Sequence, residues 1–184
     1  MLHFQFTPFP PLRTPRLVLR RVVPADAPAL LALRSNESVL RYLDREPTKT
    51  LEEAQAFIAM IEEAIVKNEA IMWGLARPED EARLLGTCGL WKLHPEHHYG
   101  EIGYLLHPDY WGQGLMTEAI TAVCRYAFEQ MHLHSIEANV NPLNAASIRA
   151  LERQGFVREA YFRENYYWRG QFYDSAIYSL LAPT

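Results

Sequence analysis

Two glycines, Gly112 and Gly114, stand between a strand-like run that ends at Pro108 and a helix-like run that begins at Leu115. The first N–H groups of a helix have no partner within it, and they lie at the positive end of the helix dipole. Because glycine carries no Cβ, a ligand can approach such groups closely. The spacing therefore indicates either an anion-binding loop, most readily for a phosphate, or a plain turn between a strand and a helix.

The loop matches neither of the common nucleotide-binding patterns. The G-x-x-x-x-G-K-[ST] pattern of a P-loop is missing, and Thr117 stands where the dinucleotide fingerprint G-x-G-x-x-G would have its third glycine. Short glycine patterns also arise often without a ligand. The local sequence alone thus leaves the nature of the anion open.

Composition and charge exclude several classes of protein. The 184 residues are 49% hydrophobic and 22% charged, which predicts one globular domain over residues 1–184 with an extended, proline-rich segment at 1–14. The net charge of -4 and the lack of a basic block argue against nucleic-acid and anionic-membrane partners. No signal-peptide pattern and no run of about 18 apolar residues is present, so we expect a cytoplasmic protein. Cys88 and Cys124 lie in apolar runs and are expected to be buried.

Hydrophobic periodicity predicts the order of the secondary-structure elements. Helical spacing is seen at 24–43, with a break near Ser35–Asn36, and at 50–68, where Thr50 and Glu53 have the spacing of a capping box. Later helices are expected at about 115–131 and 144–155, the latter ended by Gly155. Strands are expected at 16–22, 70–78, 83–94, 99–107, 134–141, 156–168 and 171–182. This order predicts a mixed α/β layer with a largely antiparallel first half.

Four stretches of the chain, in the right order, resemble the GNAT superfamily of acyl-CoA-dependent N-acetyltransferases. They are LRTPRLVLRRVVPADAPAL, GEIGYLLHPDYWGQGLMTEAI, IEANVNPLNAASIRALERQGF and GFVREAYFRENYYWRGQFYDSAIYSLL. The likeness is to the branch of the RimJ and RimL ribosomal-protein N-terminal acetyltransferases, and it runs from about residue 12 to 182. It implies the GNAT fold, in which helices flank a mixed and mostly antiparallel central sheet. It also implies acetyl-CoA as cosubstrate, a primary amine as acceptor, and no metal.

The resemblance implies a binding site for the cofactor around the glycine loop. The strand before the loop would be splayed from its neighbour, with Leu105, Leu106 and His107 facing the pantetheine arm. The pyrophosphate would meet backbone N–H groups and the Thr117 hydroxyl in the segment formed by Gly112, Gln113, Gly114, Leu115, Met116 and Thr117. Trp111 and Met116 depart from the family pattern Q/R-x-x-G-x-G/A, and the size of Met116 raises the question whether it weakens phosphate binding.

The resemblance assigns the next roles to the helix that starts at Asn144. Asn144 would hydrogen-bond the pantetheine, and it would also suit a plain N-cap. Ser147 would lie near the sulfur and protonate the leaving thiolate, although an inert helix serine is the ordinary alternative. Arg149 and Arg153 are candidates for contacts with the nucleotide phosphates or are solvated surface residues.

Acyl transfer to an amine requires a neutral nucleophile. An α-amino group has a pKa of about 8, so a modest general base is sufficient. Glu101 is the first candidate for this base, directly or through a water, and a surface carboxylate is the alternative reading. Glu137 is the second candidate, unless Asn139 is the residue of that strand nearest the acyl centre. The Leu106 N–H is expected to polarise the thioester carbonyl.

The sequence does not identify the amine acceptor or the oligomeric state. The amine could belong to a protein N-terminus or to a small molecule such as an antibiotic, a polyamine or an amino acid. A non-catalytic CoA-binding sensor is the alternative from another class. Tyr166, Tyr167 and Trp168 are candidates for acceptor contacts, and the chain is expected to be a monomer or a homodimer. His94, His97 and His98 fall in a loop without a cysteine, so a zinc site is not expected.

Overall fold

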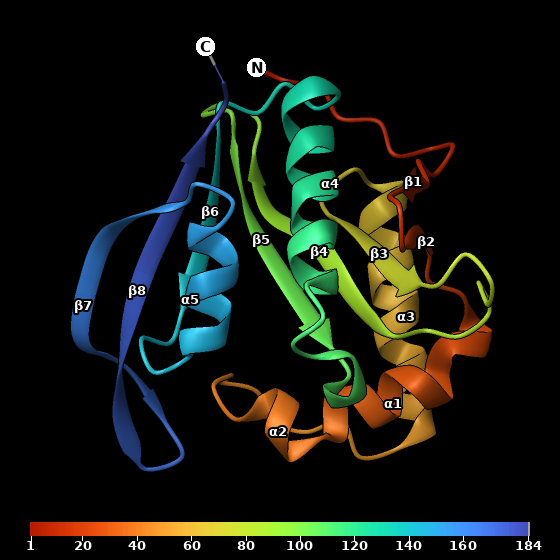
Figure 1. The fold of residues 1–184 in the computed structure, drawn as a ribbon, viewed down its shortest axis with the longest axis horizontal. Coiled ribbons are helices and arrows are strands. Elements are labelled where there is room, and N and C mark those ends of the chain that lie inside the picture. The colour runs from red at the N-terminus through yellow and green to blue at the C-terminus, as the bar shows by residue number, and fades with distance from the viewer. Residues whose placement is uncertain (184) are drawn as a thin grey trace.

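The computed structural model describes residues 1–183. Its eight strands form one sheet in the order β1-β2-β3-β4-β5-β6-β8-β7 (Figure 1). The strands are β1 (Leu12–Arg13), β2 (Val18–Arg21), β3 (Ile71–Ala76), β4 (Gly86–His94), β5 (Tyr99–Leu106), β6 (Ser135–Val140), β7 (Val157–Trp168) and β8 (Gln171–Leu181). The helices are α1 (Ala27–Ser35), α2 (Glu37–Leu40), α3 (Leu51–Val66), α4 (Leu115–Glu129) and α5 (Ala145–Glu152), with short 3-10 turns at Pro24–Asp26 and Pro108–Tyr110.

Neighbouring strands run antiparallel throughout the sheet, except for the parallel pair β5 and β6. The predicted mixed and mostly antiparallel sheet is thereby confirmed. The hairpin between β7 and β8 turns at Arg169 and Gly170, whose φ angles are 46° and 84°. Positive φ at both central residues is what a two-residue loop requires if its twist is to match that of the strands.

Helices cover both faces of the sheet. In the view of Figure 1, α4 and α5 lie in front of the sheet and α3 lies behind it. The buried side chains of α4 recur at helical spacing and include Ala119, Ile120, Val123 and Ala127. They join a core in which Trp73 on β3 is fully buried. The amphipathic pattern of the sequence thus fixes which side of α4 faces the sheet.

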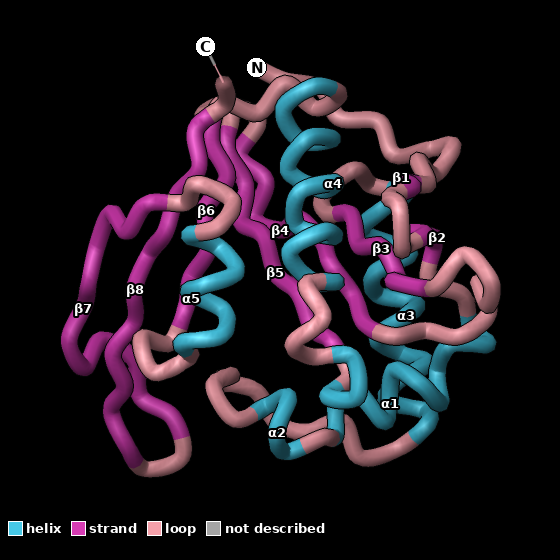
Figure 2. The backbone as a smooth tube through the Cα atoms, viewed as in Figure 1, coloured by secondary structure: helices cyan, strands magenta, loops and turns pink. Residues whose placement is uncertain are grey.

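Local polar contacts set the helix boundaries in the first half of the chain. Asn36 accepts hydrogen bonds from the Ser38 and Val39 N–H groups, and this capping separates α1 from α2 as predicted (Figure 2). Thr50 accepts a bond of 3.2 Å from the Glu53 N–H. The Glu53 carboxylate, however, accepts from the Lys49 N–H at 2.7 Å rather than from Thr50. The predicted capping box is therefore wrong in its second half, because the extended backbone before α3 brings the Lys49 donor closer.

The parallel strands β5 and β6 separate part-way along their length. They pair at Tyr99 with Ser135, Gly100 with Ile136 and Glu101 with Glu137. Beyond Glu101 each strand continues without pairing to the other, and Figure 1 shows them diverging toward α2. The sheet is split here, so backbone groups on the facing edges are left without sheet partners. None of the helices within residues 1–183 has the length and apolar character needed to cross a bilayer.

Candidate active site

Leu106 presents a backbone N–H to the split in the sheet. The next residue, His107, donates its N–H to the Leu85 carbonyl at 2.9 Å, on the β4 side. Because successive residues of a strand direct their backbone groups to opposite edges, Leu106 and Tyr104 direct theirs away from β4. The Trp111 indole N–H donates to the Leu106 carbonyl at 2.8 Å. The Leu106 N–H therefore faces the opening, as does that of Tyr104, while the His107 N–H is bonded within the sheet.

The two glycines of the loop are explained by backbone conformation. Gly112 and Gly114 have φ angles of 72° and 76°, in the left-handed region that glycine adopts without strain. The first helical bond runs from the Glu118 N–H to the Gly114 carbonyl at 3.1 Å. The N–H groups of the three residues from Leu115 to Thr117 consequently have no partner within α4. Space above Gly112 is open, since an added Cβ would meet nothing within 4 Å. These features fit an anionic group at the start of α4.

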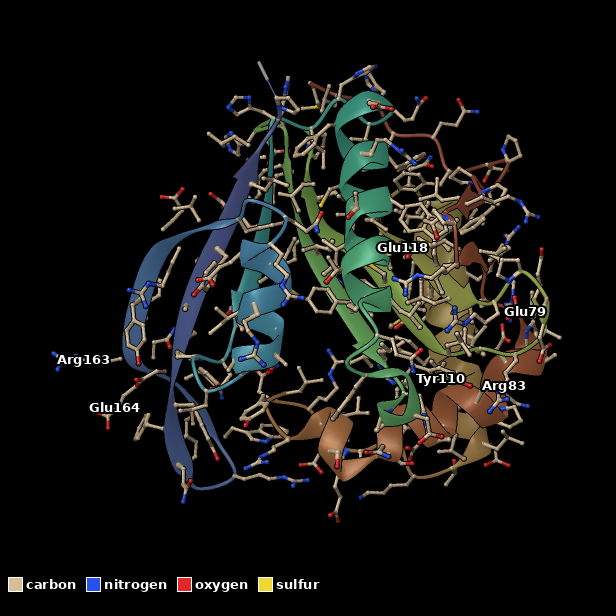
Figure 3. The ribbon with its side chains drawn as sticks, viewed as in Figure 1. Glu79, Arg83, Tyr110, Glu118, Arg163 and Glu164 are labelled. Atoms are coloured by element: carbon tan, nitrogen blue, oxygen red, sulfur yellow. The ribbon has the colours of Figure 1, made fainter. Side chains whose placement is uncertain are left out.

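A segment near the N-terminus, which contains Thr14 and Arg16 and is here called the N-terminal arm, contacts the glycine loop and the first turn of α4. The Arg16 guanidinium donates to the Gln113 carbonyl at 2.8 Å, and its Nε donates to Glu118 at 2.7 Å. Glu118, labelled on α4 in Figure 3, also accepts from the Thr14 hydroxyl and the Arg16 N–H. Burial raises the pKa of Glu118, but these hydrogen bonds outweigh it and bring the pKa below its ordinary value. The ionised Glu118 carboxylate thus joins the N-terminal arm to the start of α4 through these hydrogen bonds.

Glu118→Gln should lower the free energy of unfolding at pH 7 by about 1–3 kcal/mol, the usual range for a hydrogen bond to a charged group. A lowered pKa in the folded state stabilises the fold above the unfolded pKa and loses that effect as the pH falls. The difference from wild type should therefore be full above about pH 6 and should shrink below about pH 4. Urea unfolding at several pH values measures it. Glu129→Gln, on the exposed end of α4, is the matched control. Equal losses at pH 3 and pH 7 would contradict this role.

A cleft of about 1220 Å³ runs from the glycine loop through the split in the sheet. Most of the candidate residues line it: Glu101, Leu105, Leu106, Gly112, Gly114, Leu115, Met116, Thr117, Asn144 and Ser147. Two candidates do not. The Gln113 side chain turns away to Asp109 and Arg77, and His107 lies outside the lining. Arg149 and Arg153 on α5 also line the cleft.

A bond between Tyr104 and Ser147 bridges the split. Their hydroxyl oxygens are 2.7 Å apart, which joins β5 to α5. The Asn144 side chain accepts from the Ser147 N–H at 3.1 Å, so the predicted N-cap is confirmed. Burial raises the pKa of Tyr104, and the phenol stays protonated at neutral pH. The pair can therefore present a proton on the α5 side of the cleft.

Glu101 lies on the other face of the sheet from this hydroxyl pair. Side chains alternate along a strand, and Glu101 is three residues before Tyr104. The Glu101 side chain is 26% exposed and accepts from the Lys92 ammonium at 2.7 Å. Asn139 lines the cleft, whereas Glu137 does not. A carboxylate on one face of β5 and a hydroxyl pair on the other thus both line the cleft.

The remaining candidates lie in three places: the cleft, the exposed surface of the β7–β8 hairpin and the core. Tyr166 lines the cleft, and Trp168 lines an adjoining pocket of about 310 Å³. Tyr167 packs against Phe172, with ring centroids 5.0 Å apart. Cys88 and Cys124 are free and buried as predicted. Burial raises the pKa of both thiols, that of Cys124 to about 12, so neither is a ready nucleophile.

Sequence reasoning missed Tyr104 and the cleft residues contributed by α1 and the segment after α2. Tyr104 could have been found, because it shares its strand edge with Leu106 at a spacing of two. Arg34 and Arg45 also line the cleft, and nothing in their local sequence marks them. Within the described part of the chain, no cluster of three or more His, Cys, Asp or Glu side chains is arranged to hold a metal ion.

The geometry first defines a class: a mixed α/β protein whose split sheet and adjoining helix start form a site for an extended anionic ligand. Comparison with known proteins makes this specific. The acetyltransferase (GNAT) domain matches residues 16–157. The uncharacterised N-acetyltransferase YoaA of Bacillus subtilis (strain 168) is 37% identical over 175 residues, which cover 95% of this chain and 98% of YoaA.

Two further proteins resemble the chain, one in sequence and the other in fold. The [ribosomal protein uS5]-alanine N-acetyltransferase of Escherichia coli (strain K12) is 33% identical over 130 residues, covering 70% of this chain and 66% of that enzyme. The structure of RimL, a ribosomal L7/L12 alpha-N-protein acetyltransferase in complex with coenzyme A, has a TM-score of 0.85. It is 21% identical in sequence, with 94% of this chain and 98% of RimL covered, and shows a shared fold. The chain belongs to the GNAT family of acetyltransferases.

Proposed function

We propose that this acetyltransferase transfers an acetyl group from acetyl-CoA to a primary amine, with the α-amine of a protein N-terminus as the acceptor. The observation that carries the proposal is the cleft itself. It joins the unpartnered N–H groups at the start of α4 to Glu101 by way of the open edge of β5. A ligand that is phosphorylated at one end and reactive at the other fits such a path.

The residues around the loop suit the pyrophosphate and nucleotide parts of acetyl-CoA. The N–H groups from Leu115 to Thr117 and the Thr117 hydroxyl would bind the pyrophosphate at the positive end of α4. Met116 is partly buried against the core, so its bulk points at least in part away from the loop. Arg149 and Arg153 add positive charge on the α5 side of the cleft. The Leu106 N–H would bind the pantetheine arm or the acyl carbonyl.

The role of each residue in the acyl transfer follows from the face of the sheet on which its side chain lies. Bound acetyl-CoA supplies a thioester. Glu101 takes a proton from the acceptor ammonium, directly or through a water, so that the amine becomes nucleophilic. The Leu106 N–H stabilises negative charge that develops on the carbonyl oxygen. As the new C–N bond forms and the C–S bond breaks, the Tyr104–Ser147 pair delivers a proton to the leaving sulfur, and the proton released from the amide nitrogen replaces it. The amine and the thioester would therefore approach from opposite faces of the sheet and meet at the split.

The choice of a protein N-terminus rests on two relatives and on the shape of the site. The E. coli relative acts, by its name, on an alanine of a ribosomal protein, and RimL on a protein α-amine. The acceptor side of the cleft is also continuous with the pocket beside Trp168, so a chain of several residues has room.

A mass-spectrometric screen tests the proposal. Purified protein and acetyl-CoA would be incubated with N-terminal peptides, and with polyamines, aminoglycosides and amino acids. Acetylation of peptides at the α-amine, with kcat/KM above that for every small amine, is the expected result. Faster acetylation of a small amine would overturn the choice of acceptor, and acetylation of no amine would overturn the transfer reaction proposed for this cleft.

Gly114→Glu should raise the Kd for acetyl-CoA at least ~10-fold, or about 1.4 kcal/mol. The substitution places a carboxylate at the helix start where the pyrophosphate would bind. Gly114→Ala is the matched control, because it imposes a similar backbone strain at φ 76° without the charge. Isothermal titration calorimetry measures both variants. If glutamate and alanine weaken binding equally, strain rather than phosphate repulsion is the cause, and an unchanged Kd would remove the loop from the site.

A further inference from the structure

Two contacts hold the side chain of Arg34 in place in the part of the cleft where the acceptor amine would bind, which we call the acceptor face; Glu101 and Arg45 line the same cleft. Arg34 lies in the last turn of α1 and is half-buried. Its guanidinium carbon lies 3.8 Å from the centroid of the Phe57 ring on α3, and its Nε donates to the Thr48 hydroxyl at 3.3 Å. These two contacts fix the plane of the guanidinium. Its terminal amino groups make no hydrogen bond to the residues that the structure describes, and Arg34 lines the cleft.

The positive charge of Arg34 has no anionic partner on the chain. Among residues 1–183, no ion pair joins Arg34 or Arg45 to a carboxylate, whereas five other arginines form one: Arg13, Arg16, Arg20, Arg21 and Arg169. Burial, and next the charge of Arg45, lower the pKa of Arg34 to about 10, so it remains charged at neutral pH. A partly buried charge without a partner is costly.

Arg45 adds a second guanidinium to the same place. It follows α2, lines the cleft together with Arg34, and has an exposed side chain. Water reaches this side chain from the cleft opening, and the cleft walls around it lower its pKa by partial desolvation, which neighbouring Asp44 offsets in part. Arg41 lines the cleft as well, with its guanidinium 5.3 Å from the centroid of the Tyr42 ring. The Glu101 carboxylate, which also lines the cleft, is already paired with the Lys92 ammonium. Three guanidinium groups, those of Arg34, Arg41 and Arg45, thus line this part of the cleft, against the carboxylates of Asp44 and of the paired Glu101.

We propose that Arg34 and Arg45 form a carboxylate-binding subsite, so that the acceptor is an amine that also bears a carboxylate. The inference rests on the proposed transfer reaction and narrows its substrate class. A guanidinium offers paired N–H donors that match a carboxylate in two parallel hydrogen bonds. The carboxylate would belong either to a free amino acid or to an acidic side chain near a peptide N-terminus. Polyamines and other wholly cationic amines are disfavoured by this surface.

The test compares acceptors that differ only in charge. One pair is a peptide with Asp and Glu after its first residue and the same peptide with Asn and Gln. The other pair is a free amino acid and its carboxamide. The Kd of each for the CoA-loaded protein and its kcat/KM are measured. We expect the acidic member of at least one pair to be preferred at least ~10-fold, and which pair it is identifies the source of the carboxylate.

Equal values within both pairs, or a preference for the uncharged members, would overturn the subsite. The binding arm keeps this result separate from the proposed function. If no acceptor is acetylated but the acidic member binds more tightly, transfer fails as a proposal and the subsite stands.

Variants of the two arginines test whether they cause the preference for the acidic acceptor. Arg34→Gln and Arg45→Gln should each raise KM or Kd for the acidic acceptor at least ~10-fold and leave the carboxamide unchanged. Arg34→Lys should restore part of the loss. Arg45 makes no hydrogen bond to a described residue, so Arg45→Gln tests the subsite without disturbing the fold. Arg13→Gln, an exposed arginine paired with Glu81, should retain the wild-type preference. A wild-type preference in both Arg34→Gln and Arg45→Gln would contradict the assignment.

Discussion

Glu101→Gln is expected to lower kcat/KM at pH 7 by about 100-fold, the lower end of the range for general base catalysis. The glutamine keeps the shape of the side chain and its place in the cleft but cannot accept a proton. The loss should diminish between pH 7 and pH 9.5, because an acceptor α-amine with a pKa of about 8 becomes neutral without assistance. Steady-state rates over this pH range, with a peptide acceptor, measure the effect.

The ion pair with Lys92 supplies the control for this experiment. Glu101 accepts from the Lys92 ammonium at 2.7 Å, so its carboxylate could act only by holding that lysine in place. Lys92→Gln removes the ammonium and keeps the carboxylate. If Glu101 is the base, Lys92→Gln should retain activity within a few-fold of wild type. A pH-independent loss in Glu101→Gln, matched by Lys92→Gln, would show that the pair is structural and that the base lies elsewhere.

Ser147→Ala and Tyr104→Phe should each lower kcat at least ~10-fold while the Kd for acetyl-CoA changes little. Both remove a hydroxyl from the pair that joins β5 to α5 at 2.7 Å. A proton donor acts on the departing sulfur in the transition state, so its loss appears in kcat rather than in ground-state binding. Single-turnover kinetics together with calorimetric binding separate the two quantities.

The double variant tests whether the two hydroxyls act together. If the proton passes along one hydrogen-bonded pair, the combined Ser147→Ala and Tyr104→Phe change should cost little more than the larger single change. Fully additive losses would indicate two independent roles. A wild-type kcat in Ser147→Ala, with a low kcat in Tyr104→Phe, would assign the donor to the tyrosine alone.

Features set by local backbone preferences were the ones predictable from sequence. The positive φ angles of Gly112 and Gly114 and the N-cap at Asn144 depend on residues within a few positions of each other. The amphipathic stripe of α4 is likewise a local pattern. These features, together with the resemblance, were sufficient to place the strand, loop and helix of the candidate cofactor site.

Features that depend on contacts distant in sequence were not predictable in the same way. Tyr104 and Ser147 are 43 positions apart, and their bond exists because the split sheet brings α5 beside β5. Arg34 faces the cleft because α1 packs on α3, where Phe57 holds the guanidinium. His107 was expected to face the cofactor, but its N–H lies on the β4 side because a one-residue step along a strand reverses the edge.

A crystal structure of the protein with bound CoA would show whether the cleft holds the cofactor along the path proposed for it. We expect the pyrophosphate to lie within hydrogen-bonding distance of the N–H groups from Leu115 to Thr117. The pantetheine arm should lie between β5 and β6, with its sulfur beside the Tyr104–Ser147 pair. Pyrophosphate bound away from the start of α4, or a pantetheine arm outside the split in the sheet, would show that this cleft is not the acetyl-CoA site.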